Sequence, residues 1–257
     1  MGMFDRKIGL VMGVANDRSI AWSIAQALWA EGAELAFTHL PSSSSERRLA
    51  RLVESRQPRL VMPCDVQSDD DLARVAEAVQ KTYGRLDFLV HSIAFAPPQE
   101  LRKSYLETTR EGWHLAMDIS AYSLVAACRA VAPLFSPGAS VLTISYLGGE
   151  RVMPGYNVMG VCKAALEHSV RYLAWDLGRE KGVRVNALSA GPMRTLSAAG
   201  IIGFDQFRAH AVQKSCLARD VEHADLATTA LYLLGPMSSG VTGETIHVDC
   251  GYSIVGL

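Results

Sequence analysis

The sequence predicts an α/β fold: a single Rossmann-like domain with a doubly wound, parallel, seven-stranded sheet and helices on both faces. Short apolar runs alternate with longer helical patterns from one end of the 257 residues to the other. The short runs are apolar at nearly every position, as strands are when helices cover both faces of a parallel sheet. No repeat, low-complexity tract or linker divides the chain, and 49% of its residues are hydrophobic. We therefore expect one domain over residues 1–257 with one core.

The expected strands are short apolar runs, each bounded by a turn signal or by the start of a helical pattern. The first of them ends at Gly13, and the second is followed by a proline and a run of serines. In chain order the expected strands cover residues 8–12, 35–38, 60–63, 86–91, 140–145, 183–188 and 245–248.

Helical periodicity fills the intervals between these strands. In the first interval Ile20, Ile24 and Leu28 recur four residues apart, and Gly32 ends the pattern. In chain order the expected helices cover residues 19–31, 46–56, 70–83, 113–135, 157–177 and 223–234. A doubly wound sheet binds its ligand beyond the carboxyl ends of its strands. Functional residues are therefore expected in the segments that follow the strands, at 13–20, 39–42, 65–66, 92–96, 145–156 and 190–196.

Charge and composition exclude several classes of partner. The 25 basic and 26 acidic residues give a net charge of −1, without the basic excess of a nucleic-acid-binding protein. The apolar stretch at 124–135 contains Arg129 and Pro133, so we expect no membrane-spanning segment. The five cysteines form no C-x-x-C pair and the seven histidines no H-E-x-x-H spacing, which argues against disulfides and a metal site. We expect a cytoplasmic protein that binds small molecules or copies of itself.

The segment after the first strand can hold the phosphates of a dinucleotide. It contains Gly13, Ala15, Ser19 and Ile20. It lacks the G-x-G-x-x-G fingerprint, but the chain can turn at its glycine just before a helix begins. A helix N-terminus offers free N–H groups and a positive dipole end to a pyrophosphate. The competing interpretation is an ordinary strand–helix turn with a polar N-cap.

Two further strand ends fit the same ligand. Asp65 can accept a hydrogen bond from an adenine amino group, with Val66 contributing its backbone, and Ser92 and Ile93 can line the cofactor. A helix cap and a simple strand end are the alternatives, but the joint placement on neighbouring strand ends favours a nicotinamide dinucleotide. The second strand is followed by His-Leu-Pro, without an acid for a ribose 2′-hydroxyl. The choice between NADH and NADPH therefore stays open on these residues.

The segment after the fifth strand carries the candidate catalytic residues. Tyr146 and Tyr156 precede Lys163, and the second tyrosine lies seven positions before the lysine. Positions seven apart on a helix lie two turns apart on one face, so Tyr156 and Lys163 are expected to point into one cleft. A neighbouring ammonium favours a phenolate and lowers the pKa of a tyrosine. A core tyrosine and a surface lysine are the alternative, which the position beyond a strand end disfavours.

Over almost its whole length the chain resembles the enoyl-acyl-carrier-protein reductases, a divergent branch of the short-chain dehydrogenases. The matching segments include G-V-A-N at 13–16, C-D-V at 64–66, H-S-I at 91–93, S-Y-L-G at 145–148, Y-N-V-M-G at 156–160 and S-A-G-P at 189–192. Most members of the superfamily carry the lysine four places after the tyrosine, where this chain has Gly160. The longer interval to Lys163 is typical of the enoyl reductase branch.

The resemblance implies that the chain reduces the trans-2 double bond of enoyl-acyl-carrier-protein thioesters in fatty acid elongation. The hydride would come from NADH, with NADPH not excluded. By the same resemblance, Tyr156 would donate a hydrogen bond to the thioester oxygen, and Lys163 would hold the ribose of the cofactor. Tyr146 would be a second active-site tyrosine, and Ala96 would contact the substrate.

Further expectations follow from the same resemblance. Met193 and Thr195 would meet the nicotinamide end of the cofactor, and residues 194–212 would form a lid over the acyl chain; a surface helix is the alternative for that stretch. Acyl-carrier protein would be the partner and a homotetramer the assembly. Two other functions compete with this one: a carbonyl-reducing short-chain dehydrogenase, such as a 3-oxoacyl thioester reductase, and a non-catalytic dinucleotide-binding regulatory protein.

Overall fold

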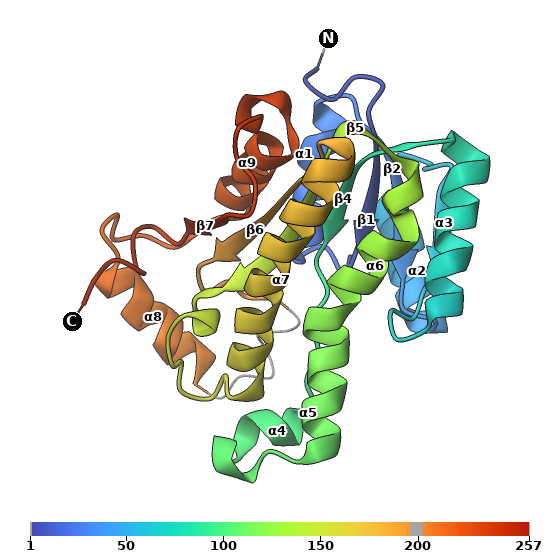
Figure 1. The fold of residues 1–257 in the computed structure, drawn as a ribbon. Helices are drawn as coiled ribbons and strands as arrows, with labels where there is room; N and C mark the ends of the chain where they lie inside the picture. Colours follow the sequence, from blue (N-terminus) through green and yellow to red (C-terminus); the bar gives the residue numbers. More distant parts are fainter. Residues whose placement is uncertain (1, 196–202, 257) are drawn as a thin grey trace.

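The computed structural model describes residues 2–195 and 203–256, and this part of the chain forms one parallel sheet covered by helices (Figure 1). The strands are β1 (Ile8–Met12), β2 (Glu34–His39), β3 (Leu60–Pro63), β4 (Leu86–His91), β5 (Phe135–Tyr146), β6 (Arg184–Ala190) and β7 (Thr245–Val248). The α-helices are α1 (Ile20–Ala30), α2 (Ser43–Val53), α3 (Asp69–Tyr83), α4 (Pro98–Arg102), α5 (Arg110–Met117), α6 (Ser123–Val131), α7 (Val158–Lys181), α8 (Phe204–Lys214) and α9 (His223–Leu234). The α/β fold class predicted from the sequence is confirmed.

The order of the strands places a crevice at the centre of the sheet. The seven parallel strands follow the order β3-β2-β1-β4-β5-β6-β7. β1 pairs with β2 on one side and with β4 on the other. The chain therefore runs outward to β3 and then returns to the centre, and such a reversal opens a crevice at the carboxyl ends of the two central strands. Those ends are Met12 and His91, which pair with each other.

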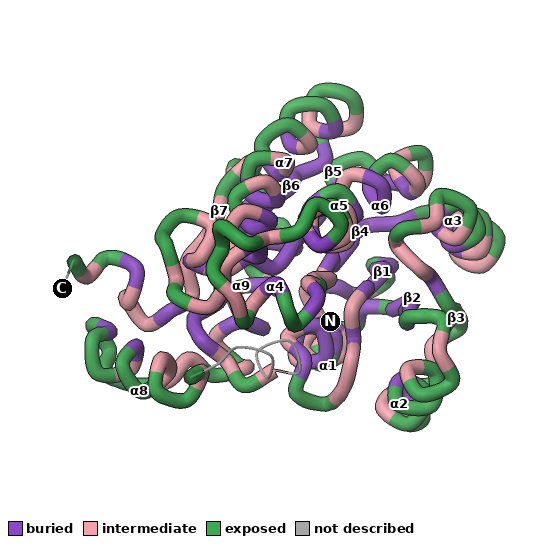
Figure 2. Tube along the Cα trace, turned by 90° about the horizontal axis from the view of Figure 1, so that it is seen from below, coloured by how far each residue is buried: buried purple, intermediate pink, exposed green. Residues whose placement is uncertain are grey.

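Two apolar layers hold the helices against the sheet. One layer contains buried residues of α3, α6 and α7, and the other contains buried residues of α1, α2 and α9. Successive residues of a strand point to opposite faces, so Leu10 packs in the first layer and Val11 in the second. Figure 2 shows the strands buried at the centre and the outer surfaces of the helices exposed. Burial on both faces explains why the strands are recognisable as continuous apolar runs.

Local signals set the bounds of several elements. The side chains of Ser42 and Ser68 each accept a hydrogen bond from the backbone N–H three residues later, which begins α2 and α3. α3 and α7 end at Gly84 and Gly182, both in the left-handed conformation that glycine adopts without steric cost. The predicted bounds of β1, β3, β4, β7 and α9 are confirmed.

The helical patterns expected over residues 113–135 are present, but the structure divides them into separate elements. The structure has α5, then a π-helical turn at Asp118–Tyr122, then α6 and a 3₁₀ turn, and β5 begins at Phe135. Within the π-helical turn the hydroxyl of Ser123 donates to the carbonyl of Ile119 at 2.6 Å. Bonds of this kind bend helices, and Pro133 prevents α6 from continuing. Helical periodicity alone does not reveal such interruptions.

The same region contains a stretch that is apolar enough to cross a membrane. Arg110–Leu134 passes this test by length and composition, yet half of its most apolar window is buried inside the protein. Leu124 and Val131 are buried in the layer that also contains α3 and α7. Packing within the fold therefore accounts for its apolar composition.

Candidate active site

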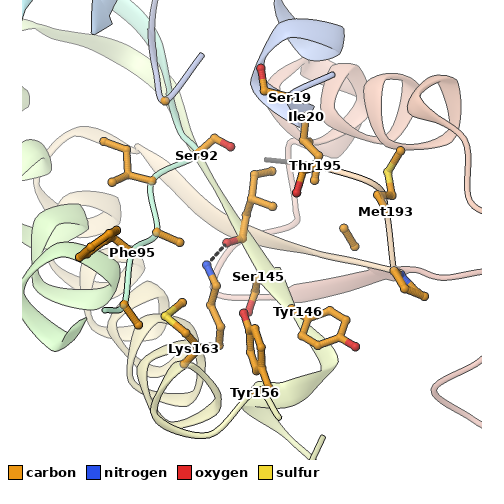
Figure 3. A pocket seen from close by; sticks show the side chains of 18 of the residues that line it. Ser19, Ile20, Ser92, Phe95, Ser145, Tyr146, Tyr156, Lys163, Met193 and Thr195 are labelled. Carbon is orange, nitrogen blue, oxygen red and sulfur yellow. Dashed lines mark hydrogen bonds between the residues drawn. The ribbon is translucent and has the colours of Figure 1, made fainter. Parts of the chain in front are cut away.

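A cavity of about 540 Å³ lies at the carboxyl ends of β1, β4, β5 and β6. It occupies the crevice that the strand order predicts, and Figure 3 shows side chains from the surrounding strands, loops and helices pointing into it. Most residues that we predicted for the site share this position. Gly13, Ala15, Ser19, Ile20, Ser92, Ile93, Ala96, Tyr146, Tyr156, Lys163, Met193 and Thr195 all line the cavity.

The loop between β1 and α1 approaches the end of β4 very closely. Gly13 has a φ of 97°, and a Cβ atom at this position would lie 2.0 Å from the carbonyl oxygen of Ser92. Only glycine permits both the conformation and the approach. Ser19 is the N-cap residue of α1, but its hydroxyl donates to the carbonyl of Asn16 at 2.6 Å instead of capping the helix. In the part of the chain that is described, this N-cap leaves the first N–H groups of α1 available to an anion.

Hydrogen bonds hold the end of β4 beneath the cavity. His91 is fully buried, and its ring nitrogens bond to the hydroxyls of Thr143 at 3.0 Å and Ser123 at 2.9 Å. Burial lowers the pKa of His91 to about 3, so the ring is neutral at physiological pH. The end of the strand is therefore fixed by a neutral hydrogen-bond network.

A serine from the π-helical turn fixes the loop that follows. The hydroxyl of Ser120 accepts from the N–H of Phe95 and donates to the carbonyl of the same residue, both at 2.8 Å. This pair of bonds sets the backbone beside Ala96, the residue predicted to contact substrate. A helix interruption that the sequence did not reveal thus supports one wall of the cavity.

The two tyrosines reach the cavity from different elements. Tyr146 is the last residue of β5, and Tyr156 lies in the turn before α7. Their ring centroids are 4.9 Å apart, with an interplanar angle of 73°. In Figure 3 the phenol oxygen of Tyr156 points toward Ser145, and that of Tyr146 points to the other side.

Tyr156 and Lys163 share the cavity as predicted, but not for the predicted reason. α7 begins only at Val158, and the intervening Asn157 has a φ of 43°. Tyr156 is therefore not two turns away from Lys163 along one helix. The turn at Asn157, and not helical periodicity, directs the tyrosine into the cavity.

Lys163 is buried at the base of the cavity. Its Nζ atom donates to the carbonyl oxygen of Ile144 at 2.7 Å, the bond drawn as a dashed line in Figure 3. Burial lowers the pKa of Lys163 to about 8, against the raising effect of Cys162 and Glu167. Glu167 follows one turn later and accepts a hydrogen bond from the hydroxyl of Ser145. An ammonium has three donors, so Lys163 can also bind hydroxyls in the cavity.

The expected direction of the tyrosine pKa shift is wrong. Burial raises the pKa of Tyr156, and charges at Cys162 and Glu167 raise it further. Burial also raises the pKa of Tyr146, with Tyr156 and Tyr252 acting in the same direction. Desolvation of the phenolate outweighs any attraction from the lysine. Both phenols are therefore neutral O–H donors, which suits them to an oxygen on which negative charge develops.

Two glycines explain why the lysine stands seven places after the tyrosine. A Cβ atom at Gly148 would lie 2.4 Å from Cδ1 of Tyr156, and one at Gly160 would lie 2.8 Å from the carbonyl oxygen of Gly148. The turn after β5 thus packs its backbone directly against the first turn of α7. A side chain at position 160 would force this backbone contact to shift, whereas Lys163 reaches the cavity without it.

The segment after β6 forms the opposite wall. Met193 and Thr195 line it, and the N–H of Thr195 donates to the carbonyl of Met193 at 2.9 Å. Residues 196–202 of the predicted lid at 194–212 lie outside the described residues. α8 begins at Phe204, which lines the cavity, and Phe207 packs edge to face on Tyr146 with centroids 6.4 Å apart. The described part of the predicted lid therefore lies beside the two tyrosines.

Asp65 and Val66 do not line the cavity, although both are among the described residues. The carboxylate of Asp65 accepts from the N–H of Gln67 at 3.0 Å, and the N–H of Asp65 donates to Asp71 at 2.9 Å. These bonds form a turn that leads into α3. Their assignment to the adenine remains a prediction.

Sequence reasoning missed residues that reach the cavity from helices or from within a strand. These are Pro98, Leu101, Ile144 and Met159. No motif marks them, since apolar side chains of this kind occur throughout the core. It also missed Glu167, which the four-residue spacing from Lys163 could have indicated, because such spacing places two residues on one helix face.

Reduction of an enoyl thioester by a nicotinamide needs a dinucleotide held across the strand ends and a donor for the oxygen on which negative charge develops. The β1–α1 turn and the neutral phenol of Tyr156 are suited to these two requirements, and both line the same cavity. Fold and cavity therefore define a dinucleotide-dependent oxidoreductase of the short-chain dehydrogenase class. A family model described as "Enoyl-(Acyl carrier protein) reductase" matches residues 13–253. The chain belongs to the enoyl-acyl-carrier-protein reductase family.

Individual relatives agree with this assignment over the full chain. An enoyl-[acyl-carrier-protein] reductase [NADH] of Nostoc sp. is 45% identical, covering 98% of this chain and 98% of its own. The crystal structure of the Aquifex aeolicus enoyl-[acyl-carrier-protein] reductase (NADH) is 42% identical with a TM-score of 0.95, covering 100% of both chains. The Bacillus cereus enoyl-acyl carrier protein reductase, solved with NADP+ and indole naphthyridinone, is 44% identical with a TM-score of 0.96, again covering 100% of both chains.

Proposed function

We propose that this chain is an enoyl-acyl-carrier-protein reductase that uses NADH to reduce the trans-2 double bond of enoyl thioesters in fatty acid elongation. The observation that carries the proposal is the meeting of Tyr156 and Lys163 in one cavity with the glycine turn at the start of α1. The relatives named as NADH enzymes support the choice of cofactor.

The cavity residues fit a dinucleotide along its length. The free N–H groups at the start of α1 would hold the pyrophosphate, with Gly13 giving it access and Ser19 and Ile20 contributing backbone. Ser92 and Ile93 would line the middle of the cofactor, and Met193 and Thr195 would meet its nicotinamide end. The close approach of Gly13 to the backbone of Ser92, which a Cβ atom would prevent, brings the β1–α1 turn and the end of β4 together at this cavity and supports the fit.

Bound NADH would supply the hydride that is added to the β-carbon of the enoyl thioester, and a proton from solvent would then be added to the α-carbon to complete the reduction. As negative charge develops on the thioester oxygen, the neutral phenol of Tyr156 donates a hydrogen bond to it. Because the raised pKa keeps the phenol protonated, the donor is in place before the charge appears. Lys163, held by the carbonyl of Ile144, binds the hydroxyls of the ribose and adds positive potential.

The apolar part of the cavity suits an acyl chain. Phe95, Ala96, Pro98, Leu101 and Phe204 give it an apolar lining, and apolar walls favour the desolvation of a hydrocarbon. The described residues of the predicted lid support a covering role over this chain, since Phe204 lines the cavity and Phe207 packs on Tyr146. Tyr146 is the second tyrosine of the site, and the thioester is delivered by acyl-carrier protein.

The rival reduction of a 3-oxoacyl thioester is disfavoured by the crowding at Gly160, where most carbonyl-reducing relatives have their lysine. A non-catalytic binding protein is disfavoured by the retention of all three candidate catalytic residues. Crotonyl and acetoacetyl thioesters should be assayed side by side, with NADH and with NADPH. Loss of NADH absorbance with the crotonyl thioester alone is the expected result. Cofactor binding without turnover of any enoyl thioester would contradict the proposal.

Assembly and location complete the proposal. We infer a homotetramer in the cytoplasm, without a nucleic-acid or membrane partner, on the grounds of family membership and of the near-neutral net charge of −1. Size-exclusion chromatography with light scattering tests the assembly. The mass of a monomer or dimer at the working concentration would refute it.

A further inference from the structure

Asn157 combines an unusual backbone conformation with a side chain that leaves its own helix. Its φ of 43° and ψ of −123° lie in a region that residues other than glycine rarely adopt. It is the N-cap residue of α7, yet its side chain does not cap the helix. Strained backbone of this kind persists only where the surroundings impose it, and it gathers at functional sites. A capping role therefore does not explain this residue.

The side chain of Asn157 instead binds the helix on the far side of the turn. Its Nδ2 atom donates to the carbonyl oxygen of Lys103 at 2.7 Å and to that of Glu100 at 3.3 Å. These carbonyls belong to the end of α4, where a helix leaves acceptors unused. A side-chain amide has two N–H donors, so both are directed at α4.

α4 is a fixed anchor for this contact. The carboxylate of Glu100 is buried, with 1% of its surface exposed, and it accepts from Lys103, from the N–H of Thr109 at 3.2 Å and from the hydroxyl of Thr109 at 2.7 Å. A Cβ atom at Gly112 would lie 2.5 Å from this carboxylate, so α5 packs directly against it. Asn157 is thus tied to a rigid part of the structure.

The two ends of this contact belong to the same cavity. Tyr156, one residue before Asn157, reaches the cavity from one side, and Pro98 and Leu101 of α4 form part of the wall. We propose that Asn157 is a positioning residue, which sets the phenol of Tyr156 relative to the wall formed by α4. Its two hydrogen bonds to α4 hold the backbone in an otherwise unfavourable conformation, and this conformation directs the neighbouring Tyr156. The inference rests on the proposed reduction of enoyl thioesters and assigns to it a residue that does not touch the substrate.

Two variants separate this role from a role in folding. Asn157→Gly relieves the backbone conformation, because glycine adopts it freely, and removes both hydrogen bonds. Asn157→Asp keeps the shape of the side chain but turns carboxylate oxygens toward two carbonyl oxygens. Gln57→Gly is the matched control, since Gln57 is an exposed residue with a φ of 45° that lies outside the cavity lining.

The assay follows crotonyl thioester reduction together with the Kd of NADH, the melting temperature and the primary isotope effect with C4-deuterated NADH. For Asn157→Gly we expect kcat to fall about 10- to 100-fold, as for a displaced reacting group. The Kd and the melting temperature should stay close to the wild-type values, and the isotope effect should rise. Asn157→Asp should lose kcat to a similar extent, and Gln57→Gly should keep the wild-type kcat.

Each other outcome has a definite meaning. Wild-type kcat in Asn157→Gly would overturn the inference and leave the proposed function intact. A loss of kcat matched by losses of NADH affinity and of melting temperature would assign Asn157 to folding and overturn it as well. A wild-type protein that reduces no enoyl thioester would overturn the proposed function itself, and with it the inference.

Discussion

Replacing Tyr156 by phenylalanine removes one oxygen atom and little else. The ring packs against Tyr146 with centroids 4.9 Å apart, and a Cβ atom at Gly148 would lie 2.4 Å from it, so the ring fills its site closely. Phenylalanine keeps these contacts. The melting temperature of Tyr156→Phe should therefore match that of the wild type, and any change in kinetics reports on the hydroxyl.

The expected effect on the rate follows from the state of this hydroxyl. Because burial raises the pKa of Tyr156, the wild-type group is a neutral O–H donor held where negative charge develops on the substrate. Removing one such donor in comparable sites lowers kcat about 100- to 1000-fold. Lys163 remains in the variant and adds positive potential, so we expect the lower end, a loss of about 100-fold or about 2.7 kcal/mol.

Binding should change much less than the rate. A neutral hydrogen bond to the uncharged thioester is worth about 0.5–1.5 kcal/mol, and the dinucleotide contacts of the site do not involve this phenol. The KM for the thioester should therefore rise about 2- to 10-fold, while the Kd of NADH stays the same.

The assay is steady-state NADH oxidation with a crotonyl thioester, with NADH binding measured separately by fluorescence. Tyr122→Phe is the matched control, since Tyr122 is 45% exposed and its hydroxyl accepts only from Arg129 among the described residues. A Tyr156→Phe variant with the kcat of the wild type would refute the assigned donor. So would a variant that lost NADH affinity in proportion to its rate.

Further predictions follow from burial and crowding. Lys163→Met should weaken NADH binding and leave the carbonyl of Ile144 without its donor, at a cost of about 1–3 kcal/mol of stability. In the wild type, NADH affinity should fall as the pH rises through about 8, because Lys163, whose pKa burial lowers to about 8, then loses its charge. The same fall in a pH titration of Lys163→Met would contradict the assignment. Gly160→Ala should destabilise the fold by about 1–3 kcal/mol, because the new Cβ atom would lie 2.8 Å from a carbonyl oxygen. Gly178→Ala on the same helix is the control, since its Cβ atom would lie 3.5 Å from the nearest atom. Thermal melts should show no comparable loss for this control. The free energy of unfolding should fall by up to about 1.4 kcal/mol per pH unit as the pH decreases from 6.5 toward about 3. In this range His91 binds a proton in the unfolded chain but stays neutral when it is buried in the folded protein. Urea titrations of His91→Gln should show a smaller pH dependence.

The lowered pKa of Lys163 also makes the stability of the fold depend on pH. Burial lowers the pKa of Lys163 in the folded protein to about 8, from the ordinary lysine value of 10.5. Between these values the unfolded chain binds the extra proton, so the stability of the wild type should rise with pH across this window. Lys163→Met should lack this rise.

Much of the fold was predictable because a covered parallel sheet imposes simple patterns. β1, β3, β4 and β7 begin and end where their apolar runs do. The helix interruption at Asp118–Tyr122 was not predictable, since it depends on where serine hydroxyls find partners across the structure. The early start of β5 was hidden for a different reason, because Ser136, Pro137 and Gly138 near its beginning are typical turn residues.

Most residues of the candidate site could be predicted from the sequence alone. The glycine turn, the two tyrosines and the lysine follow strands whose carboxyl ends meet at one edge of the parallel sheet, and in the structure they line one cavity there. The spacing from Tyr156 to Lys163 also indicated the branch of the superfamily to which the chain belongs.

Only the tertiary structure decided how these residues act. Whether Tyr156 is a phenol or a phenolate depends on desolvation by neighbours distant in the chain, which outweighs the nearby ammonium. The direction of its ring depends on the backbone of Asn157 and on carbonyls of α4 more than fifty residues away in the chain. Sequence patterns record local preference and spacing, whereas burial and contact between distant segments exist only once the chain has folded.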